Sequence, residues 1–157
     1  MAGSDHPAAQ LRTAGRVLVL DRDDRVLLIH ERTDLGSRET HWLTPGGGTE
    51  GAENPAEAAV REAFEETGLR LVLSADSALH VERHLWSLDG HWWDQTNFYF
   101  LARTDLAAPD IDPGGLTDLE LDIVLGARWW TLAELDATAE TIWPQDIVAI
   151  LERSLRP

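Results

Sequence analysis

A dense group of acidic side chains lies between residues 47 and 69. This segment holds one basic residue, Arg61, and six glutamates, at positions 50, 53, 57, 62, 65 and 66. On a helix, Glu62, Glu65 and Glu66 share one face because they are spaced i, i+3 and i+4. Like charges at that spacing repel, and a hard divalent cation with oxygen ligands, such as Mg²⁺, offsets the repulsion. We therefore expect a cation site here, with a solvated acidic helix face as the alternative.

The residues around these glutamates predict the helix that must carry them. Asn54 is a suitable N-cap, Pro55 suits the first helical position, and Glu57 completes a variant of the capping box. Gly68 lies where a C-terminal glycine stop belongs. The apolar positions of this helix predict a core-facing stripe, made of Ala56, Val60, Ala63, Phe64 and Thr67.

A run of three glycines, Gly46 to Gly48, comes directly before the acidic segment. Consecutive glycines indicate a backbone that turns sharply or lies close to another group. Such a turn can place a backbone carbonyl beside the glutamates and lets a phosphate approach. The glycine run therefore favours the cation site over the solvated face.

The segment from Gly47 to Leu69 resembles the Nudix box. That pattern is Gly-x5-Glu-x7-Arg-Glu-U-x-Glu-Glu-x-Gly-U, where U is aliphatic, and all seven fixed positions match. Ala63 is small where the family often has a larger aliphatic residue, which concerns packing rather than chemistry. Residues 42–48 and 128–135 also look like the segments that flank the box. The chain is thus identified as a member of the Nudix hydrolase (MutT-like) family.

The resemblance implies an α/β (α+β) fold, with a mixed β-sheet sandwiched between helices. It implies a hydrolase that cleaves the diphosphate of a nucleoside diphosphate linked to another moiety, using Mg²⁺ or Mn²⁺. The implied metal ligands are Glu62, Glu65 and Glu66, joined by a carbonyl of the Gly46–Gly47 turn, with Gly47 as the named ligand.

Further roles are implied for residues that do not bind the metal directly. Glu53 and Arg61 would orient the ligand carboxylates. A general base must also accept the proton of the attacking water. That base is either a box glutamate or an acid outside the box, for which Glu120 is the favoured candidate. An ordinary loop acid is the alternative for Glu120.

Substrate contacts are expected from aromatic, basic and glycine residues. A nucleobase needs a flat partner, and Trp42, beside the glycine turn, and Trp86 are candidates among the seven tryptophans. Core packing is the alternative for each tryptophan. Arg32 and Arg38 flank a loop that could reach a phosphate, with solvated surface arginine as the alternative. Gly46, Gly47 and Gly48 complete the expected substrate contacts, and the histidines are expected to be structural.

The remaining chain predicts one layered domain over residues 14–157, after a loose tail over residues 1–13. Apolar runs predict strands at 16–20, 25–30, 69–73, 78–88, 91–102 and 127–130. Asp89-Gly90 predicts a hairpin. Residues 103–118 form an acidic loop, Thr131 and Glu134 form a capping box, and Pro144 opens a final helix.

Composition limits the possible partners. The formal net charge is −15, which argues against a long nucleic acid or an anionic membrane. It allows a small phosphorylated substrate held through metal. Cysteine is absent, which argues against a Nudix-type isoprenoid diphosphate isomerase. A nucleotide-sensing module without turnover stays open as the alternative function. We expect a cytoplasmic protein, and a homodimer is possible because dimers are frequent in the family.

Overall fold

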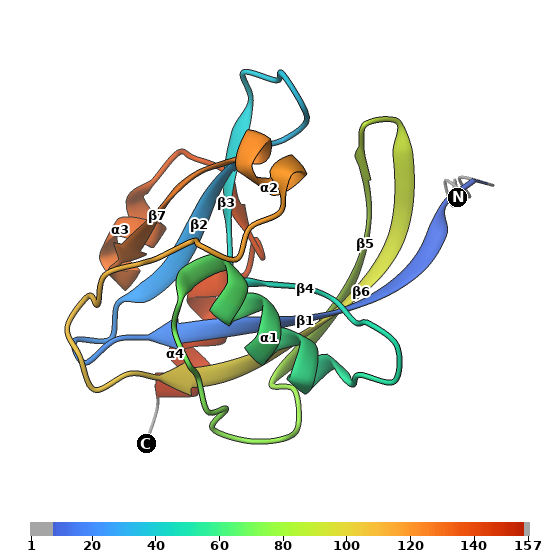
Figure 1. Ribbon diagram of the computed structural model, residues 1–157. Helices are drawn as coiled ribbons and strands as arrows, with labels where there is room; N and C mark the ends of the chain where they lie inside the picture. The colour runs from blue at the N-terminus through green and yellow to red at the C-terminus, as the bar shows by residue number, and fades with distance from the viewer. Residues whose placement is uncertain (1–7, 156–157) are drawn as a thin grey trace, which may run out of the picture.

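The computed structural model describes residues 8–155, which contain one mixed eight-stranded sheet and four α-helices. The path through the sheet is β5-β6-β1-β2-β3-β8, with β4 paired to β1 and β7 paired to β2 (Figure 1). In chain order the elements are β1 (Gln10–Leu20), β2 (Val26–Arg32), β3 (Thr40–Leu43), β4 (Gly46–Gly48), α1 (Pro55–Thr67), β5 (His80–Leu88), β6 (His91–Arg103), α2 (Asp118–Ile123), β7 (Val124–Trp130), α3 (Leu132–Ala137), β8 (Ile142–Trp143) and α4 (Ile147–Leu155).

The centre of the sheet is the parallel pair β1–β6. Its register runs without a break from Gln10↔Trp93 to Leu20↔Arg103. The four residues from Val17 to Leu20 are fully buried, as expected for a strand covered on both faces. One core cluster includes Leu18, Leu20 and residues of α4, and the other includes Val17, Val19 and residues of α1. The two clusters confirm the predicted fold class, a mixed sheet between helices.

Helix α1 begins and ends where the sequence predicts. Asn54 and Glu57 form the reciprocal capping box, and Gly68 adopts the left-handed conformation with a φ of 74°. The helix lies close to β1. A Cβ placed on Gly15 would be only 1.8 Å from the carbonyl oxygen of Pro55. The predicted apolar stripe is wrong at Phe64, which is 42% exposed beneath the guanidinium of Arg70. Small alanines pack against the sheet instead, since the close approach leaves no space for a phenyl ring.

The β5–β6 hairpin extends away from the body of the sheet (Figure 1). Its turn is the predicted Asp89-Gly90 pair, and both residues have positive φ, 51° and 76°. Positive φ at both central positions is the property of the hairpin turn that Asp-Gly favours. The face of this hairpin that is turned toward the rest of the sheet therefore borders the space beside the sheet.

Two predictions about the limits of elements need correction. Strand β1 begins at Gln10, so residues 10–13 belong to the sheet and the expected tail is too long; residues 1–7 lie outside the described range. The predicted strand at 69–73 is wrong, because only an isolated bridge joins Leu73 to Ala102. A local run of β-forming residues does not by itself supply a strand to pair with.

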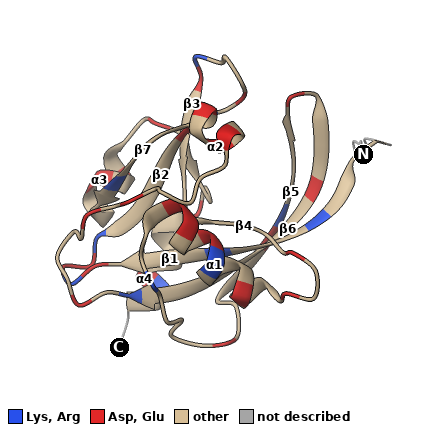
Figure 2. Cartoon of the chain, viewed as in Figure 1, with Lys and Arg blue, Asp and Glu red and all other residues tan. Residues whose placement is uncertain are grey.

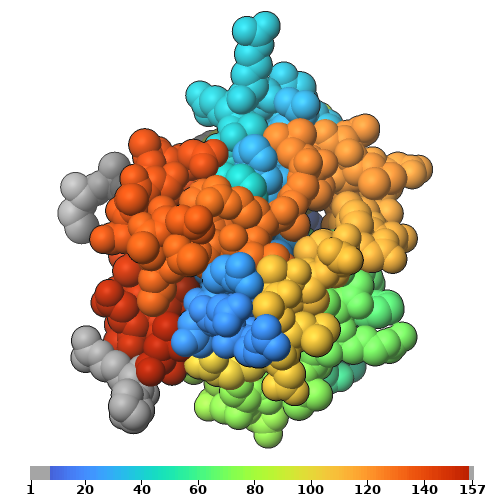
Figure 3. Space-filling model, turned by 90° about the vertical axis from the view of Figure 1, so that its left-hand side faces the viewer, coloured from blue at the N-terminus to red at the C-terminus, as the bar shows by residue number. Residues whose placement is uncertain are grey.

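The acidic loop is anchored to the body of the protein and ends in a helix. The Leu106 carbonyl accepts from the Arg22 N–H at 3.0 Å, and the Ala108 N–H donates to Asp21 at 2.8 Å. Figure 3 shows this loop (yellow to orange) packed beside the β1–β2 turn (blue). The chain then forms α2 at Asp118, with Thr117 as its N-cap. The anchored loop thus positions α2 and its residue Glu120.

Within residues 8–155, none of the helices has both the length and the apolar character that crossing a membrane requires.

We predict that Gly15→Ala destabilises the fold, because its Cβ would overlap the carbonyl of Pro55 and force α1 away from β1. The expected loss is about 1–3 kcal/mol of unfolding free energy, measured by urea denaturation. Gly114→Ala is the control, since its Cβ would meet only the side chain of Asp112, at 3.3 Å. Equal stability of the two variants would contradict the prediction.

Candidate active site

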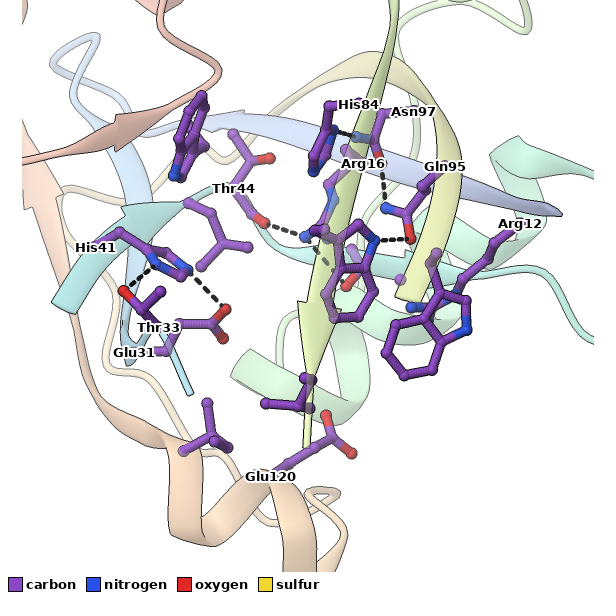
Figure 4. Close-up of a pocket in the computed structure, with 18 of the residues that line it drawn as sticks. Arg12, Arg16, Glu31, Thr33, His41, Thr44, His84, Gln95, Asn97 and Glu120 are labelled. Atoms are coloured by element: carbon purple, nitrogen blue, oxygen red, sulfur yellow. Dashed lines mark hydrogen bonds and ion pairs between the residues drawn. The ribbon is translucent and has the colours of Figure 1, made fainter. Parts of the chain in front are cut away.

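A cavity of about 740 Å³ opens between the β5–β6 hairpin, β1, the β2–β3 region, α1 and α2 (Figure 4). Its size is in the range of small-molecule sites. Two carboxylates of the predicted cation site, Glu62 and Glu66, line it together with Gly46 and Gly47. Glu120 of α2 lines the cavity as well. The fold therefore gathers residues from distant parts of the chain around one space.

Arg61 is the centre of the hydrogen-bond network of the acidic helix. Its Nε and Nη2 donate to the two oxygens of Glu53 at 2.8 and 2.9 Å, and Nη2 also donates to the Gly48 carbonyl at 2.9 Å. Its Nη1 donates to Glu62 at 3.0 Å and lies 3.4 Å from Glu65. The bond to Glu53 is the main cause that raises the pKa of Arg61 and lowers that of Glu53. These contacts agree with the supporting roles predicted for Arg61 and Glu53.

The carboxylate of Glu66 is enclosed by protein atoms, although the residue as a whole is half-buried. One oxygen accepts from the Gly46 N–H at 2.9 Å, and this is its only hydrogen bond within the described range. Burial raises the pKa of Glu66 well above its ordinary value, and burial also raises the pKa of Glu62. Carboxylates in this state stabilise a bound cation, because the cation replaces the lost hydration of the charge.

The glycine turn leaves no space for side chains beside these carboxylates. A Cβ on Gly47 would lie 2.5 Å from the carboxyl carbon of Glu62, and Gly46 has a φ of 150°. The backbone of β4 can therefore lie directly against α1. This close approach is the physical reason for the glycine run.

The donor set fits a hard divalent cation, because Glu62 and Glu66 supply carboxylate oxygens to the same cavity beside Gly46 and Gly47. As the side chains stand, no group of three or more histidine, aspartate or glutamate residues within 8–155 converges on one point. Arg61 Nη1 lies between Glu62 and Glu65 and holds both carboxylates. Glu65 does not line the cavity, and its predicted ligand role stays a prediction.

Two arginines of β1, Arg12 and Arg16, face the same cavity (Figure 4). None of the ion pairs within residues 8–155 includes either arginine. Arg16 donates to the Thr44 carbonyl at 2.9 Å, and Arg12 lies over the Trp86 ring, 5.4 Å from its centroid. Burial, and then the neighbouring Arg16, lower the pKa of Arg12. The cavity thus presents cationic donors near its carboxylates, which suits phosphate oxygens.

The structure separates the predicted substrate contacts into two groups. Arg32 and Trp86 line the cavity, as do Gly46 and Gly47. Trp42 does not: it is 9% exposed and stacks on His30, with ring centroids 4.2 Å apart. The core-packing alternative therefore describes its position. Gly48 and Arg38 are also absent from the cavity lining.

Sequence reasoning missed several lining residues. Glu31 accepts from His41 Nε2 at 2.9 Å, and the other ring nitrogen of His41 lies 3.3 Å from the Thr33 hydroxyl (Figure 4). Gln95 and Asn97 are each 1% exposed and also line the cavity. Their one signal in the sequence was a run of four polar residues, 94–97, with aromatic residues on either side in the same strand.

Comparison with known proteins identifies the family. The NUDIX domain model matches residues 10–151. An RNA pyrophosphohydrolase from Sphingopyxis alaskensis is 33% identical over 117 residues, covering 69% of this chain and 72% of that protein. The chain therefore belongs to the NUDIX family, which confirms the resemblance recognised in its sequence.

Other relatives match a shorter part of the chain. Diphosphoinositol polyphosphate phosphohydrolase 3-beta of Bos taurus is 44% identical over 50 residues, 32% of this chain and 28% of that protein. The chain thus spans less than a third of that relative.

Solved structures support the fold. A NUDIX hydrolase from Clostridium perfringens has a TM-score of 0.65 at 21% identity, covering 93% of this chain and 97% of that one. The MutT NUDIX hydrolase from Burkholderia pseudomallei has a TM-score of 0.62 at 24% identity, covering 91% and 97%.

We predict that Glu66→Gln stabilises the metal-free protein near pH 7.5. The folded pKa of Glu66 lies above its unfolded value of about 4.3. Ionisation therefore costs folding stability, and the cost grows as the pH rises from about 4 through the folded pKa. The expected gain is about 1–3 kcal/mol, the scale of a poorly satisfied buried group, and it disappears near pH 4.

The measurement is urea denaturation in EDTA at both pH values. Glu152→Gln, an exposed glutamate of α4, is the control and should show no gain. A Glu66→Gln variant that is no more stable than the wild type at pH 7.5 would contradict the interpretation of Glu66 as an uncompensated buried charge.

Proposed function

We propose that this protein is a metal-dependent pyrophosphohydrolase that cleaves the diphosphate linkage of a nucleoside diphosphate derivative by attack of water on phosphorus. The observation that carries the proposal is the buried, poorly compensated Glu66 beside Glu62 and the β4 glycines, at the end of a cavity that also holds Arg12 and Arg16. Family membership supports the same reaction class, since the relative from Sphingopyxis alaskensis is named a pyrophosphohydrolase.

Glu62 and Glu66 would hold Mg²⁺ or Mn²⁺, with Glu65 and a carbonyl of the Gly46–Gly47 turn as the other predicted ligands. When bound, such an ion neutralises diphosphate oxygens and lowers the pKa of an adjacent water. Arg61 holds Glu62 and Glu65 in place through Nη1, and Glu53 holds Arg61.

The chain's own residues bind the phosphates and move the proton. Arg12 and Arg16, which line the same cavity, donate to phosphate oxygens in the role of charge-assisted donors. Glu120 accepts the proton of the attacking water at a carboxylate oxygen. Its position supports this role: it faces the cavity from α2, and its charge acts on both Glu62 and Arg12.

The substrate we propose is a small nucleotide. The aromatic rings of the cavity suit a flat base, whereas a diphosphoinositol polyphosphate offers no flat face and carries many more phosphates. The match to the diphosphoinositol hydrolase covers 50 residues, which is too little to transfer its substrate. The homodimer, the cytoplasmic location and the exclusion of long nucleic acids and membranes stay predictions.

We predict that Glu66→Gln abolishes hydrolysis, and that EDTA does the same to the wild type, in an assay of nucleoside diphosphate derivatives with product identification. Mg²⁺ should restore the wild type and not the variant. Tight Mg²⁺-dependent nucleotide binding by the wild type with no product over hours would instead support the nucleotide-sensing alternative. Undiminished turnover by the variant would contradict the mechanism.

Glu120→Gln should lower kcat about 100-fold or more, the usual contribution of a general base. Glutamine keeps the capping box with Thr117, so α2 should stay folded. Asp118→Asn, two residues before Glu120 on the same helix, is the control and should keep kcat within about twofold. An unchanged kcat in Glu120→Gln would assign the base to a box glutamate.

A further inference from the structure

A chain of four side chains lies on the inner face of the β5–β6 hairpin, and we call it the donor wall: His84, Trp86, Gln95 and Asn97. Trp86 Nε1 donates to Gln95 Oε1 at 3.0 Å, and Gln95 Nε2 donates to Asn97 Oδ1 at 2.6 Å. Asn97 Nδ2 lies 3.1 Å from His84 Nδ1. All four residues line the cavity (Figure 4).

The direction of this hydrogen-bond chain follows from its first member. An indole nitrogen can only donate, so Gln95 must turn its carbonyl oxygen toward Trp86. The Gln95 amide nitrogen then faces the Asn97 oxygen, and the Asn97 nitrogen faces His84. His84 Nδ1 must therefore accept, which leaves the proton on Nε2.

Every member of the wall after Trp86 consequently keeps a donor in reserve. Each amide nitrogen has two hydrogens, and the wall uses one on Gln95 and one on Asn97. His84 Nε2–H is the third donor. Burial, and then the charge of Arg16, lower the pKa of His84, in agreement with a neutral ring. His84 is an exposed residue, so the cost of a buried N–H without a partner applies to Gln95 and Asn97, which are each 1% exposed. The wall therefore favours a ligand that brings acceptors.

Aromatic surface lies beside these donors. The rings of Trp86 and Trp93 stack with centroids 4.5 Å apart and an interplanar angle of 22°. Trp143 stacks on His84, with an interplanar angle of 1°. All three tryptophans line the same cavity. A ligand that meets the donors therefore also meets flat rings, and a planar heterocycle satisfies both features.

We propose that the donor wall determines base specificity, favouring a base with carbonyl acceptors, guanine or uracil, over adenine. This inference deepens the proposed function and rests on it for the nucleotide nature of the substrate. Guanine O6 or uracil O4 accepts from the spare N–H groups, whereas adenine carries an amine, which is a donor, at the corresponding position. A polar site that leaves such groups unpaired discriminates strongly.

The test is calorimetric titration of the full chain with GMP, UMP and AMP in the presence of Mg²⁺. These monophosphates contain no diphosphate bond, so binding is measured without turnover. We expect GMP or UMP to bind at least about tenfold more tightly than AMP. Equal affinities, a preference for AMP, or no binding of any of the three would overturn the proposal.

Two variants test whether the hydrogen bonds of the donor wall set this base preference. Trp86→Phe keeps an aromatic ring but removes the N–H that orients Gln95, and the preference should fall to about twofold or less. Gln95→Glu replaces the amide donor by acceptors, and AMP should then bind at least as well as GMP and UMP. The matched control is Trp129→Phe, because Trp129 Nε1 donates to the Pro109 carbonyl at 3.1 Å, outside the cavity lining.

The control should keep the wild-type preference. A thermal melt of each variant separates loss of the fold from loss of discrimination. If Trp86→Phe and Gln95→Glu both fold and both keep the wild-type preference for GMP or UMP over AMP, the proposal is overturned. The result is independent of the hydrolysis assay: a wild type that prefers GMP or UMP but cleaves no diphosphate would contradict the proposed function and leave the donor wall supported.

Discussion

The confinement of several carboxylates around Arg61 is the interaction on which the site depends. Its guanidinium joins Glu53, Glu62 and Glu65 to the Gly48 carbonyl of β4. One cation thus holds the acidic helix against the adjacent strand, although like charges at helical spacing repel one another. Arg61 is shared among several acids, so it does not neutralise them all. The uncompensated remainder, Glu66 above all, is what makes this end of the cavity a place for a metal ion.

Two close backbone contacts make this arrangement possible, that of α1 with β1 and that of β4 with α1. Gly15 on β1 lets α1 approach the sheet, and Gly47 on β4 leaves room for Glu62. The effect of the net charge of −15 on substrate choice depends on where the charged residues lie. Acidic residues gather on α1 and α2, whereas Arg12 and Arg16 contribute positive charge from β1 (Figure 2). A small anion held between arginines and a metal suits this distribution, and a long polyanion does not.

Local signals predicted much of the structure because their physics acts within a few residues. The Asn54 capping box, the Gly68 stop and the Asp89-Gly90 turn each depend on backbone conformation or on a hydrogen bond to a near neighbour. The predicted stripe on α1 was wrong at Phe64 because burial depends on what the helix packs against. The spacing of its apolar residues contains no record of how close β1 lies.

The sequence by itself determined the acidic helix, its caps, the glycine turn, the NUDIX family and thereby the fold class. Its family pattern is a local one, since the box is a single continuous segment. Only the tertiary structure decided which other residues share the cavity. The parallel β1–β6 register brings Arg12 beside Gln95 and Arg16 beside Tyr99, some 80 positions later in the chain. The tertiary structure also places Trp42 in the core and Trp86 at the cavity. Contacts between distant strands arise from sheet pairing and packing, and no spacing of residues along the chain encodes them directly.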